Sequence, residues 1–271
     1  MIKTLKHILN GVNINMNRIN KLFKEKKNKI LSIYFTAGYP NLNDTTEIIK
    51  ILDEYGVDLI EVGMPFSDPI ADGPIIQHSS NVAIDNGMNL NLLFKQLDEI
   101  RKITDIPIVL MGYVNPVYQF GYEKFIKNIL QCDLDGLILP DLPLDDYINE
   151  FKPIFDRENL SFIPLITPNT SEERIRQIDN NSNGFIYMVS SSSITGKKNS
   201  FDDKQIDYFQ KISNLSLKNP TIIGFGISDK ESFEQACKYS QGAIIGSKFI
   251  KEISNGNLNE SIKKFILSVR S

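Results

Sequence analysis

Residues 58–74 read Asp-Leu-Ile-Glu-Val-Gly-Met-Pro-Phe-Ser-Asp-Pro-Ile-Ala-Asp-Gly-Pro, a short apolar strand followed by a turn-rich loop. A strand points successive side chains to opposite faces, so Glu61 lies on the face opposite Ile60 and Val62. A carboxyl group held among apolar side chains loses hydration, and this loss raises its pKa towards neutrality. We therefore predict that Glu61 can both donate and accept a proton.

A second carboxylate, Asp72, follows in the Pro- and Gly-rich loop. We expect Asp72 to be more solvated than Glu61 and to stay ionised, so that the two acids form a candidate acid/base pair with different roles. The alternative for Glu61 is a hydrogen-bonded acid of the core, although buried glutamates are rare. The alternative for Asp72 is a turn residue or a helix N-cap.

Around this unit, short β-branched segments alternate with longer amphipathic segments from residue 30 onwards. The predicted strands span residues 30–36, 58–63, 107–113, 136–141, 161–167, 184–190, 220–226 and 242–247. The predicted helices span residues 44–55, 90–103, 122–131, 144–158, 172–179, 202–215, 230–239 and 258–269, with an additional helix over 75–86. This alternation predicts an α/β fold, a single (β/α)8 barrel with a parallel sheet. A doubly wound open sheet is the alternative.

Composition excludes several classes of protein. The 271 residues carry a net charge of -3 and are 41% hydrophobic, which suits one large domain. No apolar run approaches the roughly 20 residues of a membrane span. The Lys- and Asn-rich start, residues 1–29, predicts a solvated helix rather than a nucleic-acid site. Cys132 and Cys237 are expected to be reduced packing residues of a cytoplasmic protein, and His7 and His78 have no metal-ligand spacing.

Glycine and hydroxyl residues follow the last predicted strands. Gly226 and the pair Gly246 and Ser247 stand after the seventh and eighth strands, where barrels of this type bind phosphate through backbone N–H groups. Thr195 and Gly196, after the sixth strand, could add further donors. None of the eight predicted strands contains a lysine, so a Schiff-base aldolase has no nucleophile there.

The loop over residues 65–74 resembles the signature of the tryptophan synthase alpha subunit family. The resemblance extends from about residue 16 to the C-terminus, through residues 35–40, 111–116, 139–143, 195–196, 224–228 and 246–247. It implies retro-aldol cleavage of indole-3-glycerol phosphate to indole and D-glyceraldehyde 3-phosphate, without a cofactor in this subunit. It also implies an α2β2 tetramer with a beta subunit that holds pyridoxal phosphate and receives the indole.

The resemblance assigns roles residue by residue. Glu61 matches the glutamate that protonates indole C3 and takes the proton of the adjacent glycerol hydroxyl, and Asp72 matches the aspartate that accepts from the indole N–H. Tyr187 matches a tyrosine near that glutamate, with an ordinary core aromatic as the alternative. The phosphate positions are Gly196, Gly226, Gly246 and Ser247, the walls of the indole pocket are Tyr34, Tyr113 and Phe225, and the partner interface includes Pro65, Asp68 and Asp141.

The resemblance also sets domain limits and leaves alternatives. Residues 16–271 form the catalytic barrel, and residues 1–15, which precede the family's usual start, are expected to be a flexible extension. The segment 190–201 is expected to close over the substrate as a lid that carries Thr195, although Ser191 and Ser193 replace the Arg and Gly of well-known members. The competing functions are a phosphosugar isomerase, a free-standing indole-3-glycerol phosphate lyase and an inactive regulatory barrel.

Overall fold

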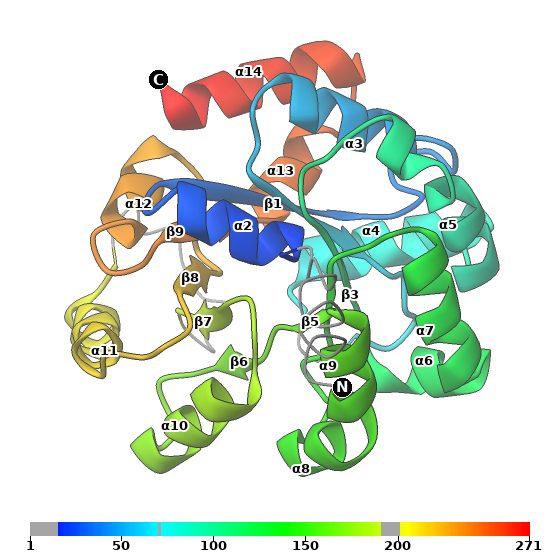
Figure 1. Ribbon diagram of the computed structural model, residues 1–271. Helices are drawn as coiled ribbons and strands as arrows, with labels where there is room; N and C mark the ends of the chain where they lie inside the picture. The colour runs from blue at the N-terminus through cyan, green and yellow to red at the C-terminus, as the bar shows by residue number, and fades with distance from the viewer. Residues whose placement is uncertain (1–15, 70–71, 191–200) are drawn as a thin grey trace, which may run out of the picture.

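The computed structural model of the chain describes residues 16–69, 72–190 and 201–271, and its strands form one curled parallel sheet with helices around it (Figure 1). The strand order is β5-β4-β3-β2-β1-β9-β8-β7-β6. The strands are β1 (Ile30–Thr36), β2 (Leu59–Gly63), β3 (Ile108–Met111), β4 (Gly136–Ile138), β5 (Ser161–Phe162), β6 (Leu165–Ile166), β7 (Ile186–Val189), β8 (Thr221–Gly224) and β9 (Gly242–Ile245). The predicted (β/α)8 barrel is confirmed.

The two ends of this strand order are consecutive in the chain. The predicted strand 161–167 is two short segments, β5 and β6, joined by Ile163 and Pro164. The N–H of Ile163 donates to Leu137 O at 3.0 Å, on the β4 side, whereas Pro164 O accepts from Tyr187 N at 3.0 Å, on the β7 side. Pro164 has no N–H, so the ladder changes partner at this residue. One bent strand therefore closes the barrel.

The helices connect the strands on the outside of the sheet (Figure 1). They are α2 (Arg18–Glu25), α3 (Thr45–Glu54), α4 (Pro74–Asp85), α5 (Leu90–Leu97), η1 (Ile100–Lys102), α6 (Val114–Phe120), α7 (Tyr122–Gln131), α8 (Leu144–Asp146), η2 (Tyr147–Phe151), α9 (Lys152–Glu158), α10 (Glu172–Asn181), α11 (Asp203–Asn214), α12 (Lys230–Ala236), α13 (Ser247–Glu252) and α14 (Leu258–Arg270). No helix of the described residues is long and apolar enough to cross a membrane.

Prolines explain two differences from the predicted helices. The segment 144–158 is not one helix but α8, the π turn η2 and α9, because Pro153 has no N–H to donate to the carbonyl four residues earlier. The sequence reading missed α6, whose Pro116 lies in the first turn, where a helix needs no N–H donor.

A further difference involves no proline. The predicted helix 90–103 ends at Leu97, the 3-10 turn η1 follows at Ile100, and the last apolar residue of the predicted helix, Ile103, is exposed.

The N-terminal helix α2 is not the solvated helix that its composition predicts. Ile19 is fully buried and Phe23 nearly so, and in Figure 1 the helix lies in front of the strands. Arg18 donates to the buried Asp135 at 3.2 Å, and Arg101 donates to the same carboxylate at 2.5 Å. Asp135 also accepts from the N–H of Ile108, the first residue of β3. This network fixes α2 at the N-terminal end of the barrel.

Residues 1–15, expected to be an extension, lie outside the described residues. The two cysteines, Cys132 and Cys237, are buried and form no disulfide, as predicted for packing residues.

Candidate active site

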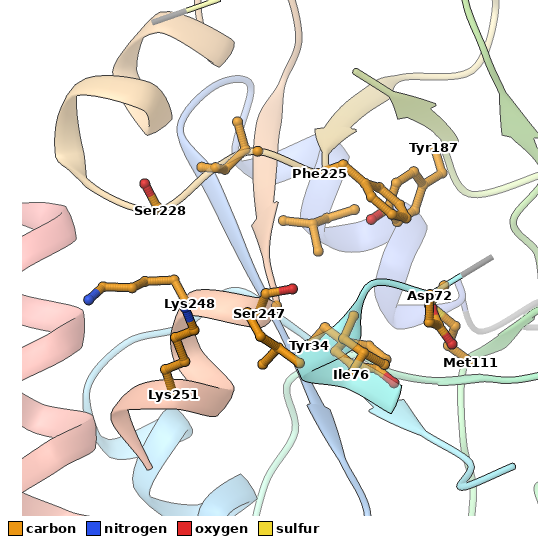
Figure 2. A pocket seen from close by; sticks show the side chains of 15 residues that line it. Tyr34, Asp72, Ile76, Met111, Tyr187, Phe225, Ser228, Ser247, Lys248 and Lys251 are labelled. Carbon is orange, nitrogen blue, oxygen red and sulfur yellow. The ribbon is translucent and has the colours of Figure 1, made fainter. Parts of the chain in front are cut away.

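The carboxyl ends of β1, β7, β8 and β9, with the loop after β2, surround a cavity of about 340 Å³ (Figure 2). The cavity brings together seven of the residues that the sequence singles out: Tyr34, Asp72, Tyr187, Phe225, Gly226, Gly246 and Ser247. The other described wall residues are Ile75, Ile76, Met111, Ile227, Ser228, Ile244, Lys248 and Lys251. The cavity therefore joins residues from opposite halves of the chain.

Glu61 lies on β2 and is completely buried. Ser32 of β1 donates its hydroxyl to Glu61 Oε1 at 2.7 Å, and Oε2 has no hydrogen-bond partner among the described residues. Burial raises the pKa of Glu61 from 4.5 to about 7, and the Ser32 hydrogen bond partly opposes this rise. A carboxyl group with such a pKa exchanges its proton readily near neutral pH.

Glu61 does not line the cavity itself. It pairs with Tyr34 across β1 and β2. Burial raises the pKa values of both Tyr34 and Tyr187 strongly, and the charges of Glu61 and Asp72 raise them further. The two carboxyl groups and the two phenols thus belong to one electrostatic cluster at the inner wall of the cavity.

Asp72 is less buried than Glu61 but is not fully solvated. It is half-buried, and burial raises its pKa from 3.8 to about 6, although a hydrogen bond from Tyr113 lowers it. Tyr113 Oη donates to Asp72 Oδ2 at 3.1 Å, and Gln77 Nε2 donates to the Asp72 carbonyl at 2.8 Å. Asp72 is thus more exposed than Glu61, as expected, although its loop end folds against β3 and α4 and this burial raises its pKa.

Two strand glycines make room for the tyrosines of the cavity. A Cβ atom at Gly63 would lie 2.3 Å from Tyr34 Oη, and one at Gly224 would lie 2.1 Å from Tyr187 Oη. Any side chain at either position would displace a phenol. Glycine is therefore required here to leave room for each tyrosine ring beside its neighbouring strand.

The loop after β8 has an unusual backbone. Phe225 has φ 67 and Gly226 has φ 77, both in the left-handed region, which is uncommon for a phenylalanine. Ser190 Oγ donates to Phe225 O, and the Phe225 ring lies 6.1 Å from that of Tyr187. This conformation turns the Phe225 side chain into the wall of the cavity (Figure 2).

Tyr113 lies in a smaller cleft rather than in the main cavity. The cleft shares Tyr34, Asp72 and Met111 with the main cavity. The ring of Phe66, also in this cleft, lies 5.3 Å from that of Tyr113. Asp72 therefore lies between the cavity and the cleft. Of the three predicted indole-pocket residues, Phe225 lines the cavity, Tyr113 lines the cleft and Tyr34 lines both.

The opposite end of the cavity is polar. Gly226, Gly246 and Ser247 meet there with Ser228, Lys248 and Lys251. The remaining predicted phosphate residue, Gly196, lies outside the described residues, as do Thr195 and the lid segment around it.

Sequence reasoning missed the two lysines and the short helix α13 that carries them. The available signal was the segment Ser-Lys-Phe-Ile-Lys-Glu after Gly246, in which Ser247 and Lys251 are four residues apart and share one face of a helix. Ser228, which also lines the cavity, belongs to the segment 224–228 of the resemblance but was assigned no role.

The residues predicted for a partner interface do not line the cavity. Asp68 and Asp141 are exposed and Pro65 is partly buried. The carboxylate of Asp141 accepts from Val114 N at 3.0 and 3.2 Å, so it already holds the start of α6. Within the described part of the chain, no group of three or more His, Cys, Asp or Glu side chains is arranged to bind a metal ion.

The comparisons with known proteins agree on one family. The family model "Tryptophan synthase alpha chain" matches residues 20–270. The tryptophan synthase alpha chains of Flavobacterium psychrophilum and Flavobacterium johnsoniae are 56% and 57% identical to this chain, over 94% of it and 100% of their own length. The crystal structure of tryptophan synthase subunit alpha from Legionella pneumophila superposes with a TM-score of 0.85 at 31% identity, over 94% of this chain and 97% of that one.

Proposed function

The chain belongs to the tryptophan synthase alpha chain family, and we propose that Glu61 and Asp72 carry the chemistry of its reaction. That reaction is the retro-aldol cleavage of indole-3-glycerol phosphate to indole and glyceraldehyde 3-phosphate. The observation that supports these roles best is a buried carboxyl group with a pKa of about 7 beside a cavity that a second carboxylate lines. The two acids lie where a (β/α)8 barrel binds its substrate.

In the first step, Glu61 in its protonated form gives its proton to indole C3. The ring then carries a positive charge that extends to its nitrogen. Asp72 accepts a hydrogen bond from the indole N–H and stabilises that charge, as a preorganised anion does. Tyr113 holds the Asp72 carboxylate in place through its hydrogen bond of 3.1 Å.

In the second step, the Glu61 carboxylate takes the proton of the hydroxyl on the glycerol carbon attached to C3. The bond between this carbon and C3 breaks, its electron pair returns to the ring and the carbon becomes an aldehyde. The proton given to C3 balances the proton taken from the hydroxyl, so Glu61 is regenerated. A pKa near 7 suits a group that must act first as acid and then as base.

Glu61 must leave its contact with Ser32 to reach the substrate, because it does not line the cavity in this conformation. Oε2 has no partner to lose among the described residues, so the movement breaks one hydrogen bond of 2.7 Å. Such a bond contributes about 1 kcal/mol, a cost that substrate binding can offset. Tyr187 lines the wall near Glu61 and is proposed to orient its carboxyl group.

The substrate fits the cavity in one direction. The aromatic end of the cavity, between Tyr34 and Phe225, suits the indole ring, and Tyr113 reaches it through Asp72. The opposite end, with Gly226, Gly246 and Ser247, suits the phosphate. Phosphate bound there would accept from backbone N–H groups and from the Ser247 hydroxyl.

The test is indole release from indole-3-glycerol phosphate. Glu61→Gln keeps the shape of the side chain but cannot transfer a proton, so the rate should fall more than about 100-fold. Asp72→Asn removes the charge and should cost about 100-fold. Glu173→Gln, on the exposed surface of α10, is the matched control and should keep the wild-type rate.

Retention of more than about a tenth of the activity in Glu61→Gln would exclude Glu61 from the proton transfers. If the wild-type chain released no indole but still bound the substrate, the alternative of an inactive regulatory barrel would hold. Binding of the substrate phosphate is tested separately, by competition with inorganic phosphate in Gly246→Val and the wild type. A Cβ at Gly246 would lie 3.2 Å from Tyr34, so added bulk there should raise KM.

We further propose that the chain works with a beta subunit, as the alpha chains of its relatives imply by name. The exposed Asp68, with Pro65 and Asp141, lies at the carboxyl ends of the strands and is the proposed contact surface of an α2β2 tetramer. Pyridoxal phosphate is expected only in that partner. Sedimentation of the mixed chains tests the association, and rapid turnover by a chain that binds no beta subunit would support a free-standing lyase instead.

We propose that this chain needs no cofactor, since Glu61 can supply both proton transfers. Dialysis against a chelator should then leave indole release unchanged. The buried, unlinked Cys132 and Cys237 support work in a reducing compartment, for which we propose the cytoplasm.

A further inference from the structure

Two lysines, Lys248 and Lys251, line the polar end of the cavity, and they differ in whether their ammonium groups are paired with carboxylates. Lys248 Nζ lies 2.5 Å from Glu252 Oε1. The charge of Lys248 also acts on Asp229: partial burial raises the pKa of Asp229, but hydrogen bonds from Ser232 and Ser228 and the charge of Lys248 lower it overall. Lys248 is therefore paired with Glu252 and also interacts with the charge of Asp229.

The ammonium group of Lys251 has no ion pair or hydrogen bond with any side chain or carbonyl in the described parts of the chain, although the Lys251 carbonyl accepts from Ser254 Oγ at 2.8 Å. It lies one helical turn after Ser247 on α13, so both side chains stand on the same face of this helix. Figure 2 shows Ser247, Lys248 and Lys251 projecting from α13 at one end of the cavity, with Tyr187, Asp72 and Met111 at the other.

Two backbone N–H groups of the neighbouring loop already have partners. The N–H groups of Ser228 and Asp229 both donate to Ser232 Oγ, at 3.0 and 3.1 Å, because they form the cap of α12. These two N–H groups are already satisfied. A phosphate dianion at this end would therefore gain from a cationic donor on the α13 side.

We propose that Lys251 is a substrate-binding residue, which places its ammonium group against the phosphate of indole-3-glycerol phosphate and holds that end of the substrate beside Ser247. This inference rests on the proposed phosphate site and adds a charged side chain to a set of backbone and hydroxyl donors. Because Lys251 is exposed, its contribution should be sensitive to ionic strength.

The experiment compares Lys251→Gln, Lys248→Gln and Lys127→Gln with the wild type. Lys127 is the matched control, an exposed lysine of α7 that lines none of the cavities described above. Three quantities are measured at low and high salt: KM and kcat for indole release, and the Kd of inorganic phosphate by calorimetry, which needs no turnover.

Lys251→Gln should raise both KM and the phosphate Kd by about five- to tenfold at low salt, with kcat held within about twofold. The difference from wild type should shrink at high salt. Lys251→Arg should recover most of the affinity, and Lys127→Gln should match the wild type. Losses in Lys251→Gln no larger than those in Lys127→Gln, or equal to those in Lys248→Gln, would overturn the assignment.

Indole release tests the roles of Glu61 and Asp72, whereas the phosphate Kd tests the role of Lys251, so the two can fail independently. If the wild type bound phosphate but released no indole, the catalytic assignment would fall, and the phosphate Kd of Lys251→Gln would still decide the role of Lys251. If Gly246→Val weakened phosphate binding while Lys251→Gln did not, the phosphate site would stand and Lys251 would have no part in it.

Discussion

Glu61 makes the folded chain less stable at neutral pH. In the unfolded chain its carboxyl group has the ordinary pKa of 4.5, whereas burial raises the folded value to about 7. Below pH 4.5 the group is protonated in both states. As the pH rises from 4.5 through 7, the unfolded chain releases this proton while the folded chain keeps it, so the free energy of unfolding falls.

Glu61→Gln should therefore be more stable than the wild type above pH 7, by an amount on the order of 3 kcal/mol, since the amide is never charged. The gain should vanish towards pH 4.5. Urea denaturation at several pH values measures it, with Glu173→Gln as the control. A gain that is constant with pH would mean that the buried carboxyl group does not titrate in this range.

Tyr113 controls the ionisation of Asp72 by donating a hydrogen bond to its carboxylate. Tyr113→Phe removes this donor, so the pKa of Asp72 should rise above its present value of about 6. Because the mechanism needs Asp72 as an anion, the acidic limb of kcat/KM should move to higher pH by about one unit. The control is Tyr122→Phe, which removes a hydroxyl that donates to the Glu150 carbonyl on the surface. This variant should leave the pH profile of kcat/KM unchanged.

At the scale of the elements, α2 depends on a buried carboxylate. Asp135 accepts from Arg18, from Arg101 and from the N–H of Ile108, and its side chain is 2% exposed. Asp133 also meets Arg18 but is 59% exposed. Asp135→Asn should lower the free energy of unfolding by about 3 kcal/mol, because it leaves two arginines without their buried partner.

Asp133→Asn is the matched control, and exposed ion pairs contribute less than about 1 kcal/mol. Denaturation by urea measures both variants. Equal losses in the two would show that α2 is held by its apolar face, through Ile19 and Phe23, rather than by the network.

The elements also show which features a sequence can predict. The face of β2 on which Glu61 lies follows from strand alternation, a local rule, and the strand order follows from the βα rhythm. The burial of Asp72 does not, because its partner Tyr113 is 41 residues away. The helices α6 and α13 were not predicted, because proline and glycine usually interrupt helices. Pro116 lies in the first turn of α6, and Gly246 precedes the first residue of α13.

At the scale of the whole molecule, stability and chemistry lie at opposite ends of the barrel. The Asp135 network precedes β4, at the N-terminal ends of the strands, whereas the cavity lies at their carboxyl ends. This separation lets substrate binding change without loss of the fold.

The double variant Asp135→Asn with Glu61→Gln tests this separation. The two changes in the free energy of unfolding should add within about 0.5 kcal/mol. Asp135→Asn alone should keep the wild-type kcat at temperatures where it is folded. A coupling above about 1 kcal/mol, or a lowered kcat, would mean that the network reaches through the barrel to the cavity.

The bent strand at Ile163 and Pro164 gives the barrel a weakest line. β5 and β6 have two residues each, whereas β1 has seven. Fluctuations that part the sheet should begin along this line, because the fewest backbone hydrogen bonds hold it there. In deuterium oxide, the amides of Ile163 and Tyr187 should exchange faster than those of Ile33 and Phe35. Local opening would then be confined to the side of the barrel formed by β5 and β6, while the side that carries Glu61 on β2 stays closed.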